Sequence, residues 1–207
     1  MSIFGKPLEE KKENEYGVKI LFLHGLEGNP EGSKSMHLKE KWCASSAPIR
    51  TQTVVEARDQ CSGNWGNLDQ KTIDGALKTP FKDALDAVNY FNPDIIVGSS
   101  LGAALLYKLY ANKNFSGAGV FLAPAIPHLL STEEISAGAE RIKNSSTVWV
   151  LGEADTIVSN SDNARIAKLV QGNLIYSPED SHRLHKALSS GLIDAAVLTV
   201  IEEQNGR

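Results

Sequence analysis

Three residues, in the chain order Ser100, Asp155 and His182, have side chains that could together cleave an acyl bond. Ser100 is the centre of residues 98–102 (GSSLG), which fit the pattern G-x-S-x-G. A serine hydroxyl becomes an effective nucleophile when a histidine accepts its proton, and a carboxylate fixes the tautomer and orientation of that histidine. In this pattern the central serine stands exposed at a tight turn. We therefore expect Ser100, rather than Ser99, to attack a substrate.

The segments on either side of Ser100 determine whether this short motif indicates a catalytic turn. Residues 93–97 (PDIIV) are an apolar, β-branched run that predicts a buried parallel strand. Residues 101–111 (LGAALLYKLYA) are mostly apolar and contain no β-branched residue, so they predict a buried helix. This order of strand, serine turn and helix is the one the chemistry requires. On the five residues alone, a glycine-rich turn without chemistry stays an alternative.

The carboxylate that would orient the histidine is expected to follow a later strand. Asp155 comes four residues after a predicted strand at 147–151, at the carboxyl edge where open α/β sheets bind ligands. Two other acids lie nearby. Glu153 is closer to the strand, and Asp162 is expected to open the next helix as a cap or first-turn residue. We favour Asp155 because of its position in the loop.

The histidine is expected in the loop before the last helix. His182 lies in such a loop, after a short predicted strand at 174–177. His185, three residues further on, is the alternative. His37 and His128 are interpreted as surface or packing residues. The loop position favours His182 as the base.

Two backbone N–H groups are also needed to hold the negative oxygen of a tetrahedral intermediate. One is expected from Leu101, which follows the nucleophile at a helix N-terminus where the helix dipole helps. The other is expected from Leu26, in the loop after a first predicted strand at 18–23. His24 would then shape that loop.

The glycine-rich loop at residues 25–32 (GLEGNPEG) also suggests a different function, because such loops often bind phosphates. The spacing does not fit. Three residues rather than four separate Gly28 from Gly32, and Ser33 precedes Lys34 instead of following it. The dinucleotide pattern G-x-G-x-x-G is absent from this loop as well. Nucleotide binding is therefore disfavoured, and no cofactor or metal is implied.

The elements that must position these groups alternate between short apolar runs and longer amphipathic segments. Strands are predicted at 18–23, 51–57, 93–97, 117–122, 147–151 and 174–177, and helices at 33–45, 81–91, 101–111 and 192–203. Ser33 is predicted to cap the first helix. Residues 58–80 form a polar stretch too irregular to assign. The alternation predicts an α/β fold with a mostly parallel central sheet and helices on both faces.

Length and composition define the class of protein. The chain has 207 residues, of which 42% are hydrophobic and 22% charged, which indicates one globular domain at 17–207 after a frayed arm at 1–16. The net charge of −4 and the lack of a long basic run argue against nucleic acid as a partner. No signal peptide or membrane span is predicted. Two cysteines, Cys43 and Cys61, fit a reducing, cytoplasmic location.

With the segments LFLHGLEGNP, IIVGSSLG, DTIV and SHRL in view, the chain resembles the α/β-hydrolase superfamily. It is most similar to small cap-less predicted esterases of the YqiA type, over residues 18–203. The resemblance implies Ser100 as nucleophile, Asp155 as acid and His182 as base. It also implies Leu26 and Leu101 as oxyanion donors. Ala103 departs from the pattern, since many relatives have a second glycine there.

Residues 123–144 occupy the place where larger members of the superfamily insert a lid, and here the segment is short, so a minimal or absent lid is expected. Candidates for lining a substrate pocket are Ile126, His128, Leu129 and Trp65, although packing is an alternative role for the apolar ones. Together these features predict a serine esterase or thioesterase acting on small molecules. The alternative is an inactive protein of the same fold that binds or scaffolds. The sequence leaves oligomeric state and substrate identity open.

Overall fold

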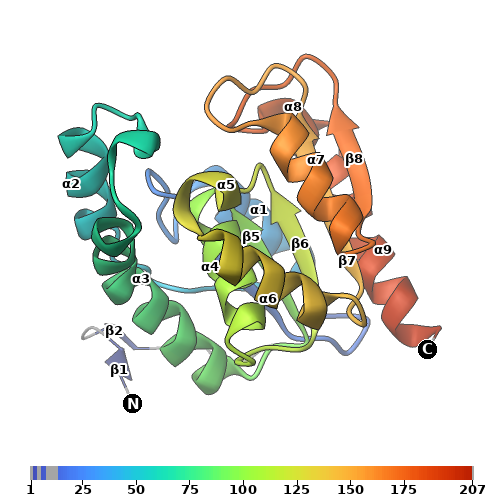
Figure 1. Cartoon of the computed structure of the whole chain (residues 1–207). Helices are drawn as coiled ribbons and strands as arrows, with labels where there is room; N and C mark the ends of the chain where they lie inside the picture. Colours follow the sequence, from blue (N-terminus) through green and yellow to red (C-terminus); the bar gives the residue numbers. More distant parts are fainter. Residues whose placement is uncertain (1, 4–5, 8–13, 207) are drawn as a thin grey trace.

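A six-stranded parallel sheet forms the centre of the computed structural model, which describes residues 2–3, 6–7 and 14–206 (Figure 1). Its strand order is β4-β3-β5-β6-β7-β8. The strands are β3 (Ile20–Leu23), β4 (Ser45–Ser46), β5 (Ile95–Ser99), β6 (Ala118–Leu122), β7 (Thr147–Gly152) and β8 (Asn173–Ser177). Every pairing in this sheet is parallel, which confirms the predicted fold class.

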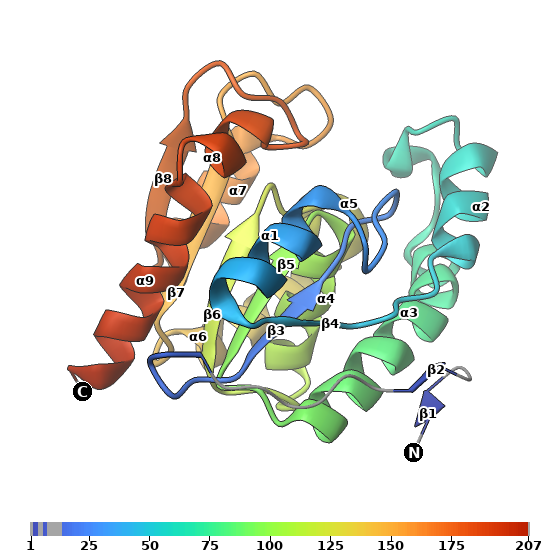
Figure 2. The ribbon, with the colours of Figure 1, turned by 180° about the vertical axis from the view of Figure 1, so that it is seen from behind.

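Helices cover both faces of this sheet, because side chains of parallel strands alternate between two buried faces. The helices are α1 (Ser33–Trp42), α2 (Gln52–Gln60), α3 (Gln70–Phe91), α4 (Leu101–Ala111), α5 (Ile126–Leu129), α6 (Thr132–Ile142), α7 (Asn160–Leu169), α8 (His185–Ser189) and α9 (Leu192–Asn205), with a short 3₁₀ helix at Trp65–Asn67. One apolar cluster joins the sheet to α2 through α7. A second cluster joins the opposite face to α1, α8 and α9. The rear view shows these three helices over that face (Figure 2).

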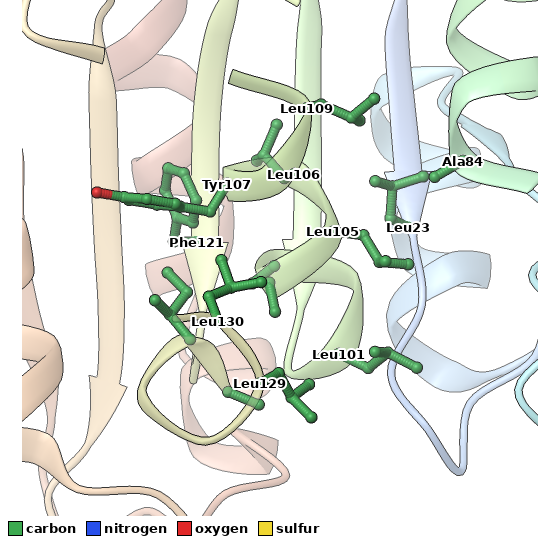
Figure 3. Close-up of a cluster of buried hydrophobic side chains, with 14 of the residues drawn as sticks. Leu23, Ala84, Leu101, Leu105, Leu106, Tyr107, Leu109, Phe121, Leu129 and Leu130 are labelled. Carbon is green, nitrogen blue, oxygen red and sulfur yellow. The ribbon is translucent and has the colours of Figure 1, made fainter. Parts of the chain in front are cut away.

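Helix α4 is the most buried helix next to the sheet, and it begins directly after the serine of the G-x-S-x-G motif. Leu101, Leu105 and Leu109 are each 1% exposed or less. They belong to one cluster with residues of β3, β6 and α5, drawn in Figure 3. The turn that carries Ser100 is therefore fixed to the centre of the hydrophobic core.

The strand predicted at residues 51–57 is wrong. The segment belongs to helix α2, in which Val54 and Ala57 are buried at helical spacing. Thr53 donates a hydrogen bond from its hydroxyl to the carbonyl oxygen of Ala76 in α3, 2.7 Å away. Packing against α3 thus outweighs the β-branched composition. The edge strand beside β3 is instead the two-residue β4.

Two predicted helix starts also differ from the structure. Helix α3 begins at Gln70, eleven residues before the expected Phe81, and the side chain of Asp69 caps it by accepting a hydrogen bond from the Thr72 amide. Gly75 and Pro80 are poor helix formers, so local propensity does not indicate the longer helix. In α1 the cap is Gly32, and Ser33 is the first helical residue rather than the cap.

The N-terminal arm predicted at residues 1–16 lies largely outside the described residues. Residues 2–3 and 6–7 pair as an antiparallel ladder, β1 (Ser2–Ile3) with β2 (Lys6–Pro7). Tyr16 stacks on Trp42 of α1, with ring centroids 5.9 Å apart. Of the helices in the described part of the chain, none has the length and apolarity to cross a membrane.

Candidate active site

The candidate residues gather where the parallel strands end. The register places the end of β3 beside β5, the end of β5 beside β6, and Gly152 of β7 beside Ser177 of β8. Loops that follow these strands therefore leave the same edge of the sheet, which is the edge where α/β folds bind ligands. Helices α2, α5 and α8 lie toward this end in both ribbon views (Figures 1 and 2).

Ser100 has a strained backbone, with φ 53° and ψ −110°. A non-glycine residue at positive φ costs about 1–3 kcal/mol and persists only where its surroundings hold it. Here the Ser100 amide donates to the carbonyl oxygen of Leu122 at 2.9 Å, and the following helix is anchored in the core. These contacts hold the strained turn in place.

The two glycines of the motif are required by close packing. A Cβ atom on Gly98 would lie 2.6 Å from the Cα of Ala103, and one on Gly102 would overlap the carbonyl oxygen of Leu23 in β3. Neither neighbour is a flexible side chain, so the backbone would have to move. The tight turn therefore depends on glycine at both positions. Ala103, which departs from the pattern of the similar esterases, is fully buried.

We expect Gly102→Ala to destabilise the protein by at least about 1–3 kcal/mol, the usual cost of overpacking a close-packed site. Gly75→Ala is the matched control, because a Cβ there meets nothing within 4 Å and alanine is the better helix former. Urea unfolding of both variants measures the difference. Equal stability of the two variants would contradict this account of the turn.

Ser100, His182 and Asp155 form a continuous hydrogen-bonded chain. His182 Nε2 lies 2.8 Å from Ser100 Oγ, and His182 Nδ1 lies 2.8 Å from Asp155 Oδ2. The Asp155 side chain is fully buried and that of His182 is 15% exposed. Nδ1–H can donate to the carboxylate while Nε2 accepts the hydroxyl proton, which is the arrangement that activates a serine.

Asp155 is held as a carboxylate by its surroundings. Burial raises the pKa of Asp155, but the hydrogen bond and charge of His182 lower it, and the pKa lies below its ordinary value. The amides of Ile157 and Val158 also donate to Oδ1, at 2.8 and 3.1 Å, and lower the pKa further. Hydrogen bonds to the charged form favour that form. Both carboxylate oxygens are thereby used for positioning.

The alternative acids and base lie elsewhere. Glu153 is exposed, and its backbone amide pairs with the carbonyl oxygen of Ser177. Asp162 lies in the first turn of α7, which Ser159 caps, and its carboxylate meets Arg165. His185 is exposed at the first residue of α8 and lines the cavity described below, but makes no hydrogen bond to Ser100 among the described residues.

Asp180 anchors the loop that carries His182, a role the sequence did not reveal. Its buried carboxylate accepts hydrogen bonds from the Ser177 hydroxyl at 3.0 Å and from the amides of Ser181 and Ala187 at 3.0 and 2.7 Å. Its carbonyl oxygen accepts from the amide of Ala154 in the Asp155 loop, 2.8 Å away. The histidine loop and the acid loop are thus held together. The only signal in the sequence was an acid two residues before the histidine.

We expect Asp180→Asn to destabilise the protein by about 1–3 kcal/mol at pH 7, since it leaves buried donors poorly satisfied. Burial raises the pKa of Asp180, but the Ala187 and Ser177 hydrogen bonds outweigh this and lower it below 3.8. A depressed pKa contributes stability above pH 3.8 that is lost as the pH falls through the lower folded-state value. Urea unfolding should therefore show a smaller gap between wild type and variant near pH 3 than at pH 7.

The control for Asp180 is Glu179→Gln, since Glu179 is an exposed carboxylate paired with Lys186. This variant should unfold at the wild-type urea concentration at pH 7. If Asp180→Asn behaves in the same way, Asp180 does not anchor the loop.

The residues expected to donate to an oxyanion, Leu26 and Leu101, line the same cavity as Ser100. A Cβ on Gly25 would lie 3.3 Å from the Cβ of Ser100, so the loop carrying Leu26 runs directly beside Ser100. The amides of Leu26 and Leu101 donate no hydrogen bond to any described residue. Both N–H groups are therefore available to a ligand oxygen.

His24 shapes this loop. Its Nδ1 lies 2.9 Å from the carbonyl oxygen of Gly25, and the amide of Ile49 donates to its Nε2 at 3.3 Å. Because Nε2 accepts, Nδ1 carries the proton and the ring is neutral. Burial lowers the pKa of His24, in opposition to the Gly25 hydrogen bond, and so favours the neutral ring.

A cavity of about 500 Å³ opens onto Ser100 and His182. Of the pocket candidates, Trp65, His128 and Leu129 line it, and His128 Nε2 lies 2.9 Å from the carbonyl oxygen of Ile157 in the acid loop. Ile126 does not, because its side chain is fully buried in the core. Helix α2 contributes Val54 and Arg58 to the cavity wall. The prediction of a strand at residues 51–57 did not anticipate this contribution. Residues 14–206 contain no cluster of three His, Cys, Asp or Glu side chains suited to a metal ion.

Comparisons with known proteins place this architecture among solved structures. No family model matches the sequence, and no curated protein matches it. A protein described as a hydrolase of the alpha/beta superfamily, from Xanthomonas campestris, is 18% identical and has a TM-score of 0.61, covering 92% of this chain and 98% of that chain. Est1E from Butyrivibrio proteoclasticus with ferulic acid bound is 18% identical with a TM-score of 0.62, covering 95% and 94%.

An alpha-beta serine hydrolase homologue from Coxiella burnetii is 16% identical with a TM-score of 0.57, covering 92% of this chain and 86% of that chain. At these identities the likeness concerns the fold, and the narrower resemblance to YqiA-type esterases stays a prediction. The parallel sheet, the strained serine turn and these structural relatives together show that the chain has the α/β-hydrolase fold.

Proposed function

We propose that this protein is a serine hydrolase that cleaves carboxylic esters or thioesters of small molecules through an acyl-enzyme. The observation that carries the proposal is the chain from Asp155 through His182 to Ser100, with both links at 2.8 Å, in which Ser100 and His182 line a cavity. A hydroxyl, an imidazole and a buried carboxylate in this order are the parts that acyl transfer requires. The relatives support it, because Est1E holds ferulic acid, a carboxylic acid of the kind that ester cleavage releases.

In the proposed reaction Ser100 Oγ attacks the carbonyl carbon while His182 Nε2 takes the hydroxyl proton. The carbonyl oxygen becomes negative and accepts hydrogen bonds from the amides of Leu26 and Leu101. The bond to the alcohol or thiol then breaks, and His182 returns the proton to that leaving group. Water hydrolyses the acyl-enzyme by the same steps, with His182 as the base. Asp155 keeps the imidazole in the productive tautomer throughout.

The proposal also covers the binding partner and the cellular location of the protein. The proposed partner is a small ester or thioester, with neither nucleic acid nor a cofactor involved. A cytoplasmic location is proposed from the free thiols of Cys43 and Cys61, which are typical of a reducing compartment.

A fluorophosphonate probe tests the proposed nucleophile. Ser100 Oγ would form a bond to phosphorus, fluoride would leave, and the hydroxyl proton would pass to His182. Peptide mass mapping should place the label on Ser100 and leave Ser99 unmodified. Absence of labelling in the folded wild-type protein, or labelling of Ser99 instead, would overturn the proposal.

A further inference from the structure

The residues that line the active-site cavity carry an excess of positive charge. Lys34, Arg58 and Arg183 line the cavity, whereas Glu27 is the one carboxylate among its described lining residues. This local excess stands in a chain whose net charge is −4. A cleft lined by one sign of charge concentrates ligands of the opposite sign.

Glu27 is shared between the two arginines and does not reach the lysine. Its Oε1 lies 3.2 Å from Arg58 Nη1, and its Oε2 lies 3.1 Å from Arg183 Nη2. Arg58 also pairs with Asp59 at 3.0 Å. Glu27 and Asp59 therefore form salt bridges with the arginines rather than with Lys34.

Lys34 is half-buried and has no hydrogen bond or salt bridge to any residue in the described part of the chain. Its electrostatic neighbours are Asp180, whose carboxylate oxygens already accept three hydrogen bonds, and the like-charged Arg183. Burial lowers the pKa of Lys34, as expected for a cation without a close partner. It also lies in the first turn of α1, where no acidic residue offsets the positive end of the helix dipole. A negative group in the cavity would satisfy it.

On the basis of the proposed hydrolase function, we infer that the substrate is an anionic ester or thioester, whose carboxylate or phosphate group lies against Lys34 while its acyl carbon lies at Ser100. Lys34 is the specificity-determining residue, and the arginines contribute to the field at the cavity mouth. Residues 28–34 lack the spacing of a phosphate loop, but the same segment supplies the cation Lys34 to the cavity wall.

Three thioesters test the inference and locate the charge. Valeryl-N-acetylcysteamine is neutral, glutaryl-N-acetylcysteamine carries a carboxylate in the acyl group, and valeryl-coenzyme A carries phosphates in the leaving group. Wild type should show a kcat/KM about tenfold or more higher for one anionic thioester than for the neutral one. The preferred substrate identifies which side of the scissile bond faces Lys34. Rates with Ser100→Ala correct for spontaneous hydrolysis.

Lys34→Gln should lower this preference by about tenfold, and Lys34→Arg should retain most of it. Lys168→Gln is the control, because Lys168 is an exposed lysine on α7 that does not line the cavity, and it should keep the wild-type preference. Equal kcat/KM for all three thioesters in wild type, or an unchanged preference in Lys34→Gln, would overturn the inference and leave the hydrolase proposal standing.

A binding measurement decides the inference even if no thioester is cleaved. Calorimetric titration of the Ser100→Ala protein with glutarate and with inorganic phosphate should detect binding of at least one anion. Adding Lys34→Gln should weaken that binding by about fivefold or more. No binding of either anion, or equal binding with and without Lys34, would count against the anionic substrate. Failure of Ser100-dependent turnover alone would instead count against the hydrolase proposal.

Discussion

Ser100→Ala should lower kcat/KM for the best small ester or thioester by about 10⁴-fold or more, since the nucleophile of a catalytic trio acts as a unit with its base. The hydroxyl of Ser100 lies 2.8 Å from His182 Nε2, so its removal leaves the base with no group to activate. The residual rate would come from binding and the oxyanion donors alone. The measurement is steady-state hydrolysis, with urea unfolding of the variant to show that the fold is intact.

Ser99→Ala is the matched control for this variant. Ser99 is buried at the end of β5 and differs from Ser100 by one position in the same motif. It should keep a kcat/KM within about threefold of wild type, because the Ser99 hydroxyl makes no hydrogen bond to Ser100 or His182. A folded Ser100→Ala protein that retains full activity would show that the protein acts through another group. Absence of activity in folded wild type, over a broad panel of esters and thioesters, would favour the alternative of an inactive binding or scaffold protein.

His182→Ala should have an effect of similar size, about 10⁴-fold or more in kcat/KM, because the serine proton then has no acceptor. The imidazole also bridges Ser100 to Asp155, with 2.8 Å on each side. Most of the change should appear in kcat rather than KM, since the imidazole acts on the transition state. Fluorophosphonate labelling should slow in parallel.

His185→Ala is the control for the base, because it removes a second histidine of the same cavity. Its activity should stay within about threefold of wild type, since His185 is exposed and does not reach Ser100. A loss of rate confined to the His185 variant would reverse the assignment. The kcat/KM of Asp155→Asn should fall between those of the two histidine variants. Its loss should reach up to about 10⁴-fold, because the imidazole would adopt the wrong tautomer.

Local sequence was sufficient where local physics determines structure. Helix α4 begins and ends at the predicted residues 101 and 111, because its apolar composition and the glycine turn before it both specify that helix. The order of Ser100, Asp155 and His182 was readable for a related reason. Each follows a short apolar strand, and parallel strands end at one edge of a sheet.

Sequence patterns failed where neighbours distant in the chain override local preference. Residues 51–57 have β-branched residues typical of a strand, yet they fold into α2 because Val54 and Ala57 pack in the core beside α3. The start of α3 was hidden by Gly75 and Pro80, whose local cost is outweighed by the burial of Ile73 and Leu77. Ile126, a pocket candidate by position, lies in the core.

The sequence by itself determined which reactive groups are present. A serine lies in a tight turn between two glycines, and an acid and a histidine follow it in order. Tertiary structure alone decided which groups meet. It brought His182 to 2.8 Å from both Ser100 and Asp155 and set Asp180 as the anchor of the histidine loop. It also left Lys34 in the same cavity without a hydrogen-bond or salt-bridge partner among the described residues. Contacts over 27 or 82 residues of chain depend on strand order and register, which periodicity within a segment does not encode.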